Sequence, residues 1–191
     1  MSGNKLRYDD DVTGSDQAVR GSDNRLNTSG RVDSRAYYNS RDRGQCYSVT
    51  FDHTTAADGE YSLYLKNTAT ANPRTLVISS VGVNATNIAR FKFWRVTGTA
   101  ANGVARIPTN QNFASPNDAE VICLHDGGGT TISGLTTSGI ELDDIQIQAN
   151  SHAEIRTGDR IRLGQNEAVA IELDTATSTP NAFGVLFFYF E

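Results

Sequence analysis

The sequence has few of the residues on which membrane insertion, disulfide frameworks and metal chemistry usually depend. Its 191 residues include two cysteines, three histidines and four prolines. No stretch reaches the roughly 20 apolar residues that a membrane-spanning helix needs. The first residues, MSGNKLRYDDD, also lack the apolar core of a secretory signal. We therefore predict a protein that is made in a cytoplasm and has no membrane partner.

The two cysteines give a further indication of the compartment. Cys46 and Cys123 both lie in segments where apolar and polar residues alternate. A disulfide between them is possible, but a reducing cytoplasm and the tendency of free cysteine to be buried favour two buried thiols.

Charge and composition narrow the class of protein. The formal net charge is −5, whereas a protein that binds nucleic acid usually presents a basic face. We therefore predict no nucleic-acid partner. Gly, Thr, Ser and Asn are frequent and good helix formers seldom occur in runs, which favours strands joined by turns.

Residues 1–44 differ from the rest of the chain, and we predict that they form an N-terminal arm attached to a β-domain at residues 45–191. The arm has eight Lys or Arg, seven Asp and almost no apolar periodicity, so alone it cannot offset its conformational entropy. It is either a disordered tail or a segment that becomes ordered on a partner. Arginine and tyrosine are common at interfaces, which favours the second alternative. The predicted partner-binding residues are Arg20, Arg25, Arg31, Arg35, Tyr37, Tyr38, Arg41 and Arg43.

From residue 45 the apolar residues recur with a period of two. The segment QCYSVTFDH alternates from Tyr47 to Phe51, and in EYSLYLKN the residues Tyr61, Leu63 and Leu65 share one face. The short link between these two runs predicts a hairpin. About eight to ten such strands follow one another with turn signals between them, apart from a long polar connection at 98–118. This pattern predicts an all-β protein, an antiparallel β-sandwich of jelly-roll type.

The final segment, NAFGVLFFYFE, is apolar on both faces of the strand that it predicts. Such a strand fits the centre of a sheet, with one face on the core and the other covered by a second subunit. We therefore expect a homo-oligomer, in particular a trimer around this strand, with either face as the contact. The predicted oligomer-interface residues are Phe183, Val185, Phe187, Phe188, Tyr189 and Phe190.

The residue pattern shows no motif for catalysis or for a bound cofactor. His53, His125 and His152 are far apart in the sequence and fit no metal-ligand spacing. The glycines of HDGGG lack the helix and the Lys-Ser/Thr of a phosphate loop. We therefore predict no catalytic residue, no cofactor-binding residue, no metal site and no enzymatic activity.

A cation site at Asp143 and Asp144, with Asp126 or Glu141 as a further ligand, is one interpretation of these acidic residues. Adjacent acids on a strand point to opposite faces and chelate poorly as a pair. A solvated bulge at Asp143-Asp144 is therefore the favoured interpretation.

The whole layout resembles a class of small virion proteins. A polar arm, the segment SRAYYNSRDRGQCYSVTFDHTTAADGEYSLYLKN and the ending AVAIELDTATSTPNAFGVLFFYFE are similar to capsid decoration (cement) or head-fibre proteins of tailed bacteriophages. The resemblance covers most of the chain. It implies a jelly-roll domain, a trimer, a location on the capsid surface of a virion, and no cofactor.

Two functions are therefore expected from the sequence. The first is a structural virion protein that binds the outside of a phage capsid and stabilises or decorates it, with the major capsid protein or another virion protein as its partner. The alternative is a receptor- or carbohydrate-binding module of a phage fibre or tail, with Trp94 and nearby tyrosines as a platform for sugars.

Overall fold

The computed structural model describes residues 7–9, 16–18, 39–54, 56–70, 74–127, 130–176 and 179–191. The chain divides into two compact units, residues 1–33 and 34–191. In the first unit, β1 (Arg7–Asp9) pairs antiparallel with β2 (Asp16–Ala18). The second unit, called the body below, carries the short π-helix η1 (Asn39–Arg43), followed by strands. Among the described residues, no helix is long and apolar enough to cross a membrane.

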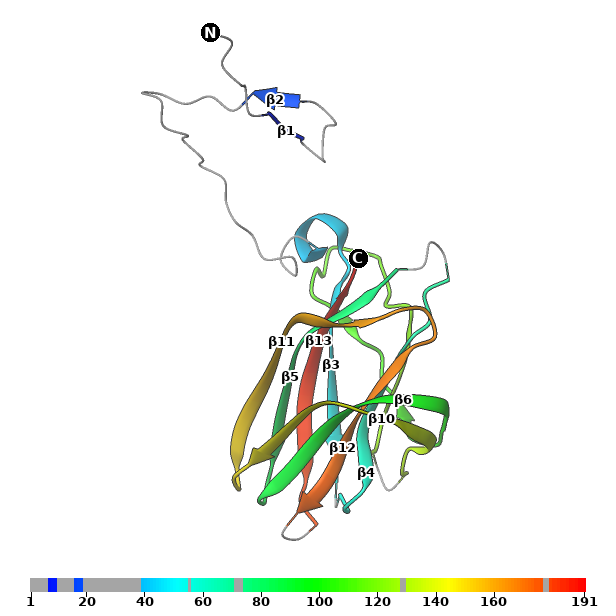
Figure 1. The fold of residues 1–191 in the computed structure, drawn as a ribbon, viewed down its shortest axis with the longest axis vertical. Helices are drawn as coiled ribbons and strands as arrows, with labels where there is room; N and C mark the ends of the chain where they lie inside the picture. The colour runs from blue at the N-terminus through cyan, green and yellow to red at the C-terminus, as the bar shows by residue number, and fades with distance from the viewer. Residues whose placement is uncertain are drawn as a thin grey trace, which may run out of the picture. The chain divides into compact units, whose positions relative to one another are not determined.

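The body is a sandwich of two antiparallel sheets, as the sequence predicted (Figure 1). One sheet has five strands, in the order β11 (Ser151–Leu163), β5 (Leu76–Ala85), β13 (Ala182–Phe190), β3 (Cys46–His53) and β8 (Thr109–Asn110). The other has six, in the order β10 (Ser133–Ile147), β6 (Ala89–Ala101), β12 (Ala168–Ala176), β4 (Glu60–Asn67), β9 (Val121–His125) and β7 (Val104–Ala105).

The connections between the long strands cross repeatedly from one sheet to the other. If β3, β4, β5, β6, β10, β11, β12 and β13 are numbered 1 to 8, the five-stranded sheet contains the order 1-8-3-6 and the six-stranded sheet 2-7-4-5. Along this series only β6 and β10 follow each other within one sheet. The short strands β7, β8 and β9 lie between β6 and β10 in the sequence and extend the two sheets beside β3 and β4.

The predicted hairpin of the first two long strands is wrong. β3 pairs with β13 and β8, whereas β4 pairs with β12 and β9 in the other sheet. The alternation that suggested a hairpin places Tyr47 and Phe51 on the core face of β3, and Leu63 and Leu65 on the core face of β4. Two strands whose apolar faces meet across a core satisfy the same sequence pattern as two strands that are hydrogen-bonded side by side.

The central position predicted for the last strand is confirmed. β13 lies between β3 and β5, and its inward side chains reach the core between the sheets. The Phe188 ring stacks on Tyr47 at 5.5 Å between centroids, and Phe190 meets both rings edge-on at 5.9 and 6.1 Å. Gly184 lies where a Cβ would meet the Phe51 ring at 2.5 Å and the backbone of β5, so this strand position needs glycine.

Residues 39–44 belong to the body, although the sequence assigned them to the arm. The long connection 98–118 contains β7 and β8 and returns to this segment. Asn112 Nδ2 donates to the carbonyl of Ser40 at 3.0 Å, and Asn117 Nδ2 donates to that of Arg43 at 3.0 Å. These bonds tie residues 39–44 to the connection 98–118, so this end of the predicted arm is held by the body of its own chain.

Both cysteines are buried free thiols, which confirms the preferred prediction. Cys123 on β9 faces the core, whereas Cys46 on β3 lies with Val77 and Tyr189 outside it.

Candidate functional site

An apolar stripe runs along the outer face of the five-stranded sheet. We use this name for Phe183, Val185 and Phe187, the alternate residues of β13 that point away from the core. Phe183 is 46 % exposed, and the other two side chains are half-buried.

The residues beside the stripe are small or polar. Across β3, the partners of Val185 and Phe187 are Thr50 and Ser48. Across β5, they are Gly82 and Ser80. The His152 ring lies over Gly82, and Gln111 donates to the Ser48 hydroxyl at 2.6 Å, so polar side chains flank this uncharged stripe.

The structure divides the six predicted interface residues between the two faces of β13. Phe188 and Phe190 are 0 and 1 % exposed in the core of their own chain, so their assignment to a subunit interface requires correction. Tyr189 points outward but is fully buried beside Cys46 and Val77. Only the stripe residues remain accessible to a second copy. The alternation of side chains along a strand predicted that these residues divide between two faces. The sequence alone did not indicate which of the two faces packs in the core.

The predicted arm residues fall almost entirely outside the described part of the chain. Arg20, Arg25, Arg31, Arg35, Tyr37 and Tyr38 lie outside the described residues, as does the side chain of Arg41. The side chain of Arg43 is exposed at the end of η1.

The outer face of the six-stranded sheet differs from that of the five-stranded sheet, because its own chain covers it. Ile132, from the segment before β10, packs on this face with Tyr64, Val96, Ala168 and Ala170. Tyr61, which was expected on the core face of β4, packs here as well.

Ion pairs cover a further part of the same face. Lys92 Nζ contacts Asp174 at 2.7 Å, and Arg90 pairs with Asp144. Asp144, considered as a cation ligand from the sequence, is therefore bound to an arginine. The register of β10 shifts just before Asp143, which agrees with the predicted bulge.

The Trp94 side chain is not a freely exposed aromatic platform on which a sugar could stack. It is half-buried, its indole N–H donates to Glu172, and Lys92 Nζ lies 5.7 Å from the ring centroid. The expected platform is therefore engaged by charged neighbours of its own chain.

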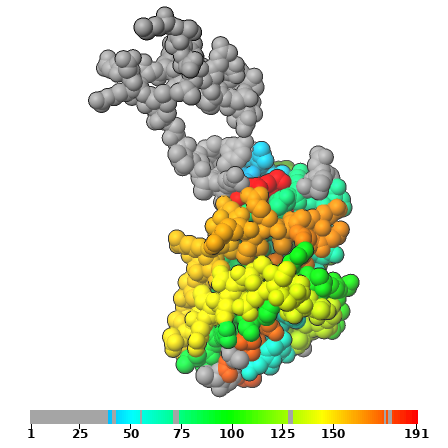
Figure 2. All heavy atoms as spheres, viewed as in Figure 1, coloured from blue at the N-terminus to red at the C-terminus, as the bar shows by residue number. Residues whose placement is uncertain are grey.

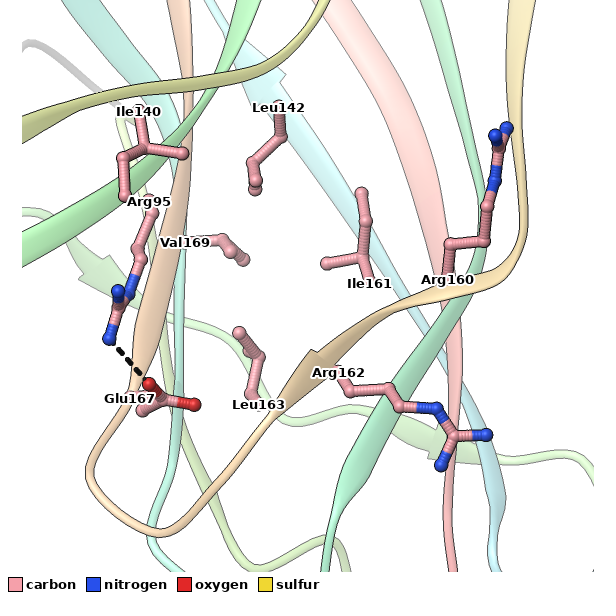
Figure 3. A pocket seen from close by; sticks show the side chains of 9 residues that line it. All are labelled: Arg95, Ile140, Leu142, Arg160, Ile161, Arg162, Leu163, Glu167 and Val169. Atoms are coloured by element: carbon pink, nitrogen blue, oxygen red, sulfur yellow. Dashed lines mark hydrogen bonds and ion pairs between the residues drawn. The ribbon is translucent and has the colours of Figure 1, made fainter.

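A pocket of about 280 Å³ lies between β10 and β11, which run beside each other on the near face in Figure 2. Its floor is apolar, with Leu142, Ile161, Leu163 and Val169 converging on its middle (Figure 3). Its rim is charged, but each rim arginine is already engaged. The bonds join Arg95 to Glu167 at 2.6 Å, Arg160 Nε to the Thr157 carbonyl at 3.0 Å, and Arg162 to Glu191 at 2.5 Å.

A buried histidine lies between two carboxylates at one end of the sandwich. His53 is the last residue of β3, Glu60 is the first residue of β4, and Asp126 directly follows β9. His53 Nε2 lies 3.2 Å from Glu60 Oε2 and 3.3 Å from Asp126 Oδ2. We call these three residues the His–carboxylate cluster. It joins the two sheets, because β3 belongs to one and β4 and β9 to the other.

The surroundings of the cluster hold its side chains in place. His53 Nδ1 lies 3.1 Å from the buried hydroxyl of Ser62. The Glu60 carboxylate accepts hydrogen bonds from the backbone N–H of Ala57 at 2.8 Å and from the Thr131 hydroxyl at 3.2 Å. The cluster is therefore organised by its own strands and turns.

Asp126 is the least satisfied member of the cluster. Its side chain is 4 % exposed, and its Oδ2 is buried without a hydrogen-bond partner. Burial raises the pKa of the Asp126 carboxyl, with His53 acting in the opposite direction and Glu60 raising it further. Such a buried acceptor is unusual in folded proteins and requires a physical explanation.

Sequence reasoning missed this cluster. It treated the histidines singly and paired Asp126 with acids on β10. The only sequence signal was that His53 and Asp126 each stand at the end of a strand, and strand ends gather at the ends of a sandwich.

Comparisons with known proteins give no relationship for this chain. No family model matches the sequence, and neither a curated protein nor a solved structure is significantly similar to it.

Proposed function

We propose that this protein is a structural virion protein of a tailed bacteriophage, which binds the outside of the capsid as a homotrimer and stabilises or decorates it. It would be made in the host cytoplasm and join the assembled shell. The observation that carries this proposal is the apolar stripe at the centre of the five-stranded sheet. The resemblance in the sequence supplies the virion context.

The strand order supports the jelly-roll part of the proposal. In a jelly roll, eight strands form two sheets through two Greek-key connections. The orders 1-8-3-6 and 2-7-4-5 agree with that arrangement, with β7, β8 and β9 as an insertion between the fourth and fifth strands.

The proposed occupant of the apolar stripe is a second copy of the same chain. The stripe is uncharged, and full burial of a phenylalanine contributes roughly 1.5–3 kcal/mol. Phe183 lies between Asp52 and Asn84, so one end of the stripe has the polar rim that protein interfaces usually carry. Three copies packed around β13 would bury all three stripe residues of each chain, which is the trimer expected from the sequence.

The proposed contact with the major capsid protein, or with another virion protein, uses a different part of the chain. The arm supplies arginines and tyrosines for this contact. The connection 98–118 is a second candidate, because it carries two of the most exposed apolar side chains, Ile107 at 89 % and Phe113 at 86 %.

The test uses purified particles that lack this protein. One variant lacks residues 1–33, which form the first compact unit, and tests the arm. A second variant, Phe113→Ser, tests the connection 98–118, and both are compared with the full chain. We expect the full chain to add to the shell at regular positions visible by electron microscopy. The truncated chain should keep its fold and its oligomeric state but lose occupancy. Equal occupancy of the truncated chain would show that the arm does not make the contact with the capsid. Failure of the full chain to bind any shell would reject the virion role.

The alternative is a receptor- or carbohydrate-binding module, and the observation in its favour is the pocket between β10 and β11. The apolar floor would receive the apolar face of a sugar ring, because the rim arginines are already bonded to groups of their own chain. Glycan binding that is lost in Leu142→Trp, which fills the pocket, and kept in Phe187→Ser would favour this function over the capsid role.

A further inference from the structure

We propose that the His–carboxylate cluster binds a divalent transition-metal ion, such as Zn²⁺ or Mn²⁺, through His53 Nε2 and one carboxylate oxygen each from Glu60 and Asp126. The ion would join the two sheets at the end of the sandwich.

Two of the three distances within the cluster match the spacing of ligands around a metal ion. Zinc binds imidazole nitrogen and carboxylate oxygen at about 2.0–2.2 Å, so two ligands of a tetrahedral ion lie about 3.4 Å apart. The Nε2 atom of His53 lies 3.2 and 3.3 Å from the two carboxylate oxygens, and the three ligand atoms are all within 4.8 Å of one another. An ion can therefore enter with small side-chain movements.

The chemistry of the ligands limits the choice of ion. Imidazole suits zinc and related transition metals, and carboxylates also suit manganese, whereas calcium and magnesium are bound mainly through oxygen. One imidazole and two carboxylates form a neutral set with a dipositive ion. Three protein ligands leave a fourth position for water, and Glu60, whose side chain is 28 % exposed, lies on the side of the cluster that water can reach.

The neighbours of His53 agree with a metal-binding tautomer. A histidine that binds a metal through one ring nitrogen usually donates a hydrogen bond from the other, which orients the ring. The Ser62 hydroxyl, 3.1 Å from Nδ1 and fully buried, is placed to accept that bond, which leaves the lone pair of Nε2 directed at the carboxylates.

The independent observation is the orphaned oxygen of Asp126. Its Oδ2 is buried and accepts no hydrogen bond, yet it points at His53 Nε2. A cation bound between these atoms supplies the partner that this oxygen lacks. A proton shared between His53 and the carboxylates is the competing explanation, and it predicts no affinity for metals.

The experiment measures metal binding by the full chain after treatment with a chelator. Zn²⁺, Mn²⁺ and Co²⁺ are each titrated by calorimetry, and the visible spectrum of the Co²⁺ form reports the coordination. We expect a single ion per chain, a Tm that rises with metal concentration, and Co²⁺ bands typical of four-coordinate geometry.

The variants separate ligands from neighbours. Asp126→Asn and Glu60→Gln keep the shape of each side chain, and each should weaken binding by more than about 100-fold, because even residues that only orient a ligand cost about 10–100-fold. Ser62→Ala should cause a loss within that smaller range. His152→Gln is the matched control, because His152 is an exposed histidine on β11, away from the cluster.

Two results would overturn the proposal. One is the absence of binding by the folded wild type for all three ions. The other is binding that Asp126→Asn and Glu60→Gln leave unchanged. If Asp126→Asn does not fold, Glu60→Gln decides the question, because Glu60 is partly exposed and tolerates the change.

Discussion

The two neighbouring phenylalanines Phe187 and Phe188 offer a direct test of how β13 is used. They have the same side chain on the same strand but face opposite sides of the sheet. Phe188 is fully buried and contacts the rings of Tyr47 and Phe190. Truncation of a buried phenylalanine removes its transfer free energy and leaves a cavity. We therefore expect Phe188→Ala to lower the free energy of unfolding by about 3–5 kcal/mol.

Phe187→Ala should behave differently, because Phe187 is only half-buried on the outer face. Half of the roughly 1.5–3 kcal/mol for full burial gives a loss of about 1 kcal/mol in a single chain. If the stripe is a subunit contact, Phe187→Ala should also shift the protein towards monomers. Phe188→Ala should leave the oligomeric state of its folded fraction unchanged.

Urea denaturation of both variants measures the two losses, and analytical ultracentrifugation over a range of concentrations measures assembly. Equal losses for Phe187→Ala and Phe188→Ala would refute the assignment of the two faces. A wild type that sediments as a monomer at micromolar concentration would refute the subunit contact while leaving the face assignment intact. Glu154→Gln, an exposed residue on the outer face of β11 two strands away from β13, controls for nonspecific effects on this face.

Three further outcomes are expected from single sites. Burial raises the pKa of the Cys123 thiol to about 12, so Cys123 should not react with a thiol reagent at mildly alkaline pH until urea unfolds the protein. Asn67→Ala removes a buried amide that donates to two backbone carbonyls at 2.9 Å each; each carbonyl left unsatisfied costs about 1–3 kcal/mol, measurable by urea denaturation. The Arg90 guanidinium lowers the pKa of Asp144, so this pair stabilises the fold above the ordinary pKa of aspartate and the contribution is lost as the pH falls through the lowered value. In acid titrations of stability, Asp144→Asn should lack this part of the pH dependence, and an unchanged profile would contradict it.

Much of the fold could be read from local patterns. The alternation in β3 placed Tyr47, Val49 and Phe51 on one face, and all three are core residues. The two apolar faces of the last segment indicated a central strand, which β13 is. These predictions succeed because a strand turns alternate residues to opposite sides whatever its partners are.

The pairing of strands could not be read in the same way. β3 and β4 are close in sequence and lie in different sheets, and Tyr61 faces away from Leu63 and Leu65 because the register of β4 with β12 shifts beside it. A hairpin and a connection that crosses between the sheets bury the same apolar residues. The two differ in the path of the backbone, which the alternation of apolar and polar residues does not reveal.

The sequence alone determined the strand character of the body, the two-faced apolar nature of residues 183–190 and the separate composition of the N-terminal segment. The tertiary structure decided that Phe188 and Phe190 close the core while Phe183, Val185 and Phe187 face outward. It also brought His53, Glu60 and Asp126 together. Each of these outcomes depends on which strands meet across the sandwich, and that choice is made by the packing of side chains distant in the sequence.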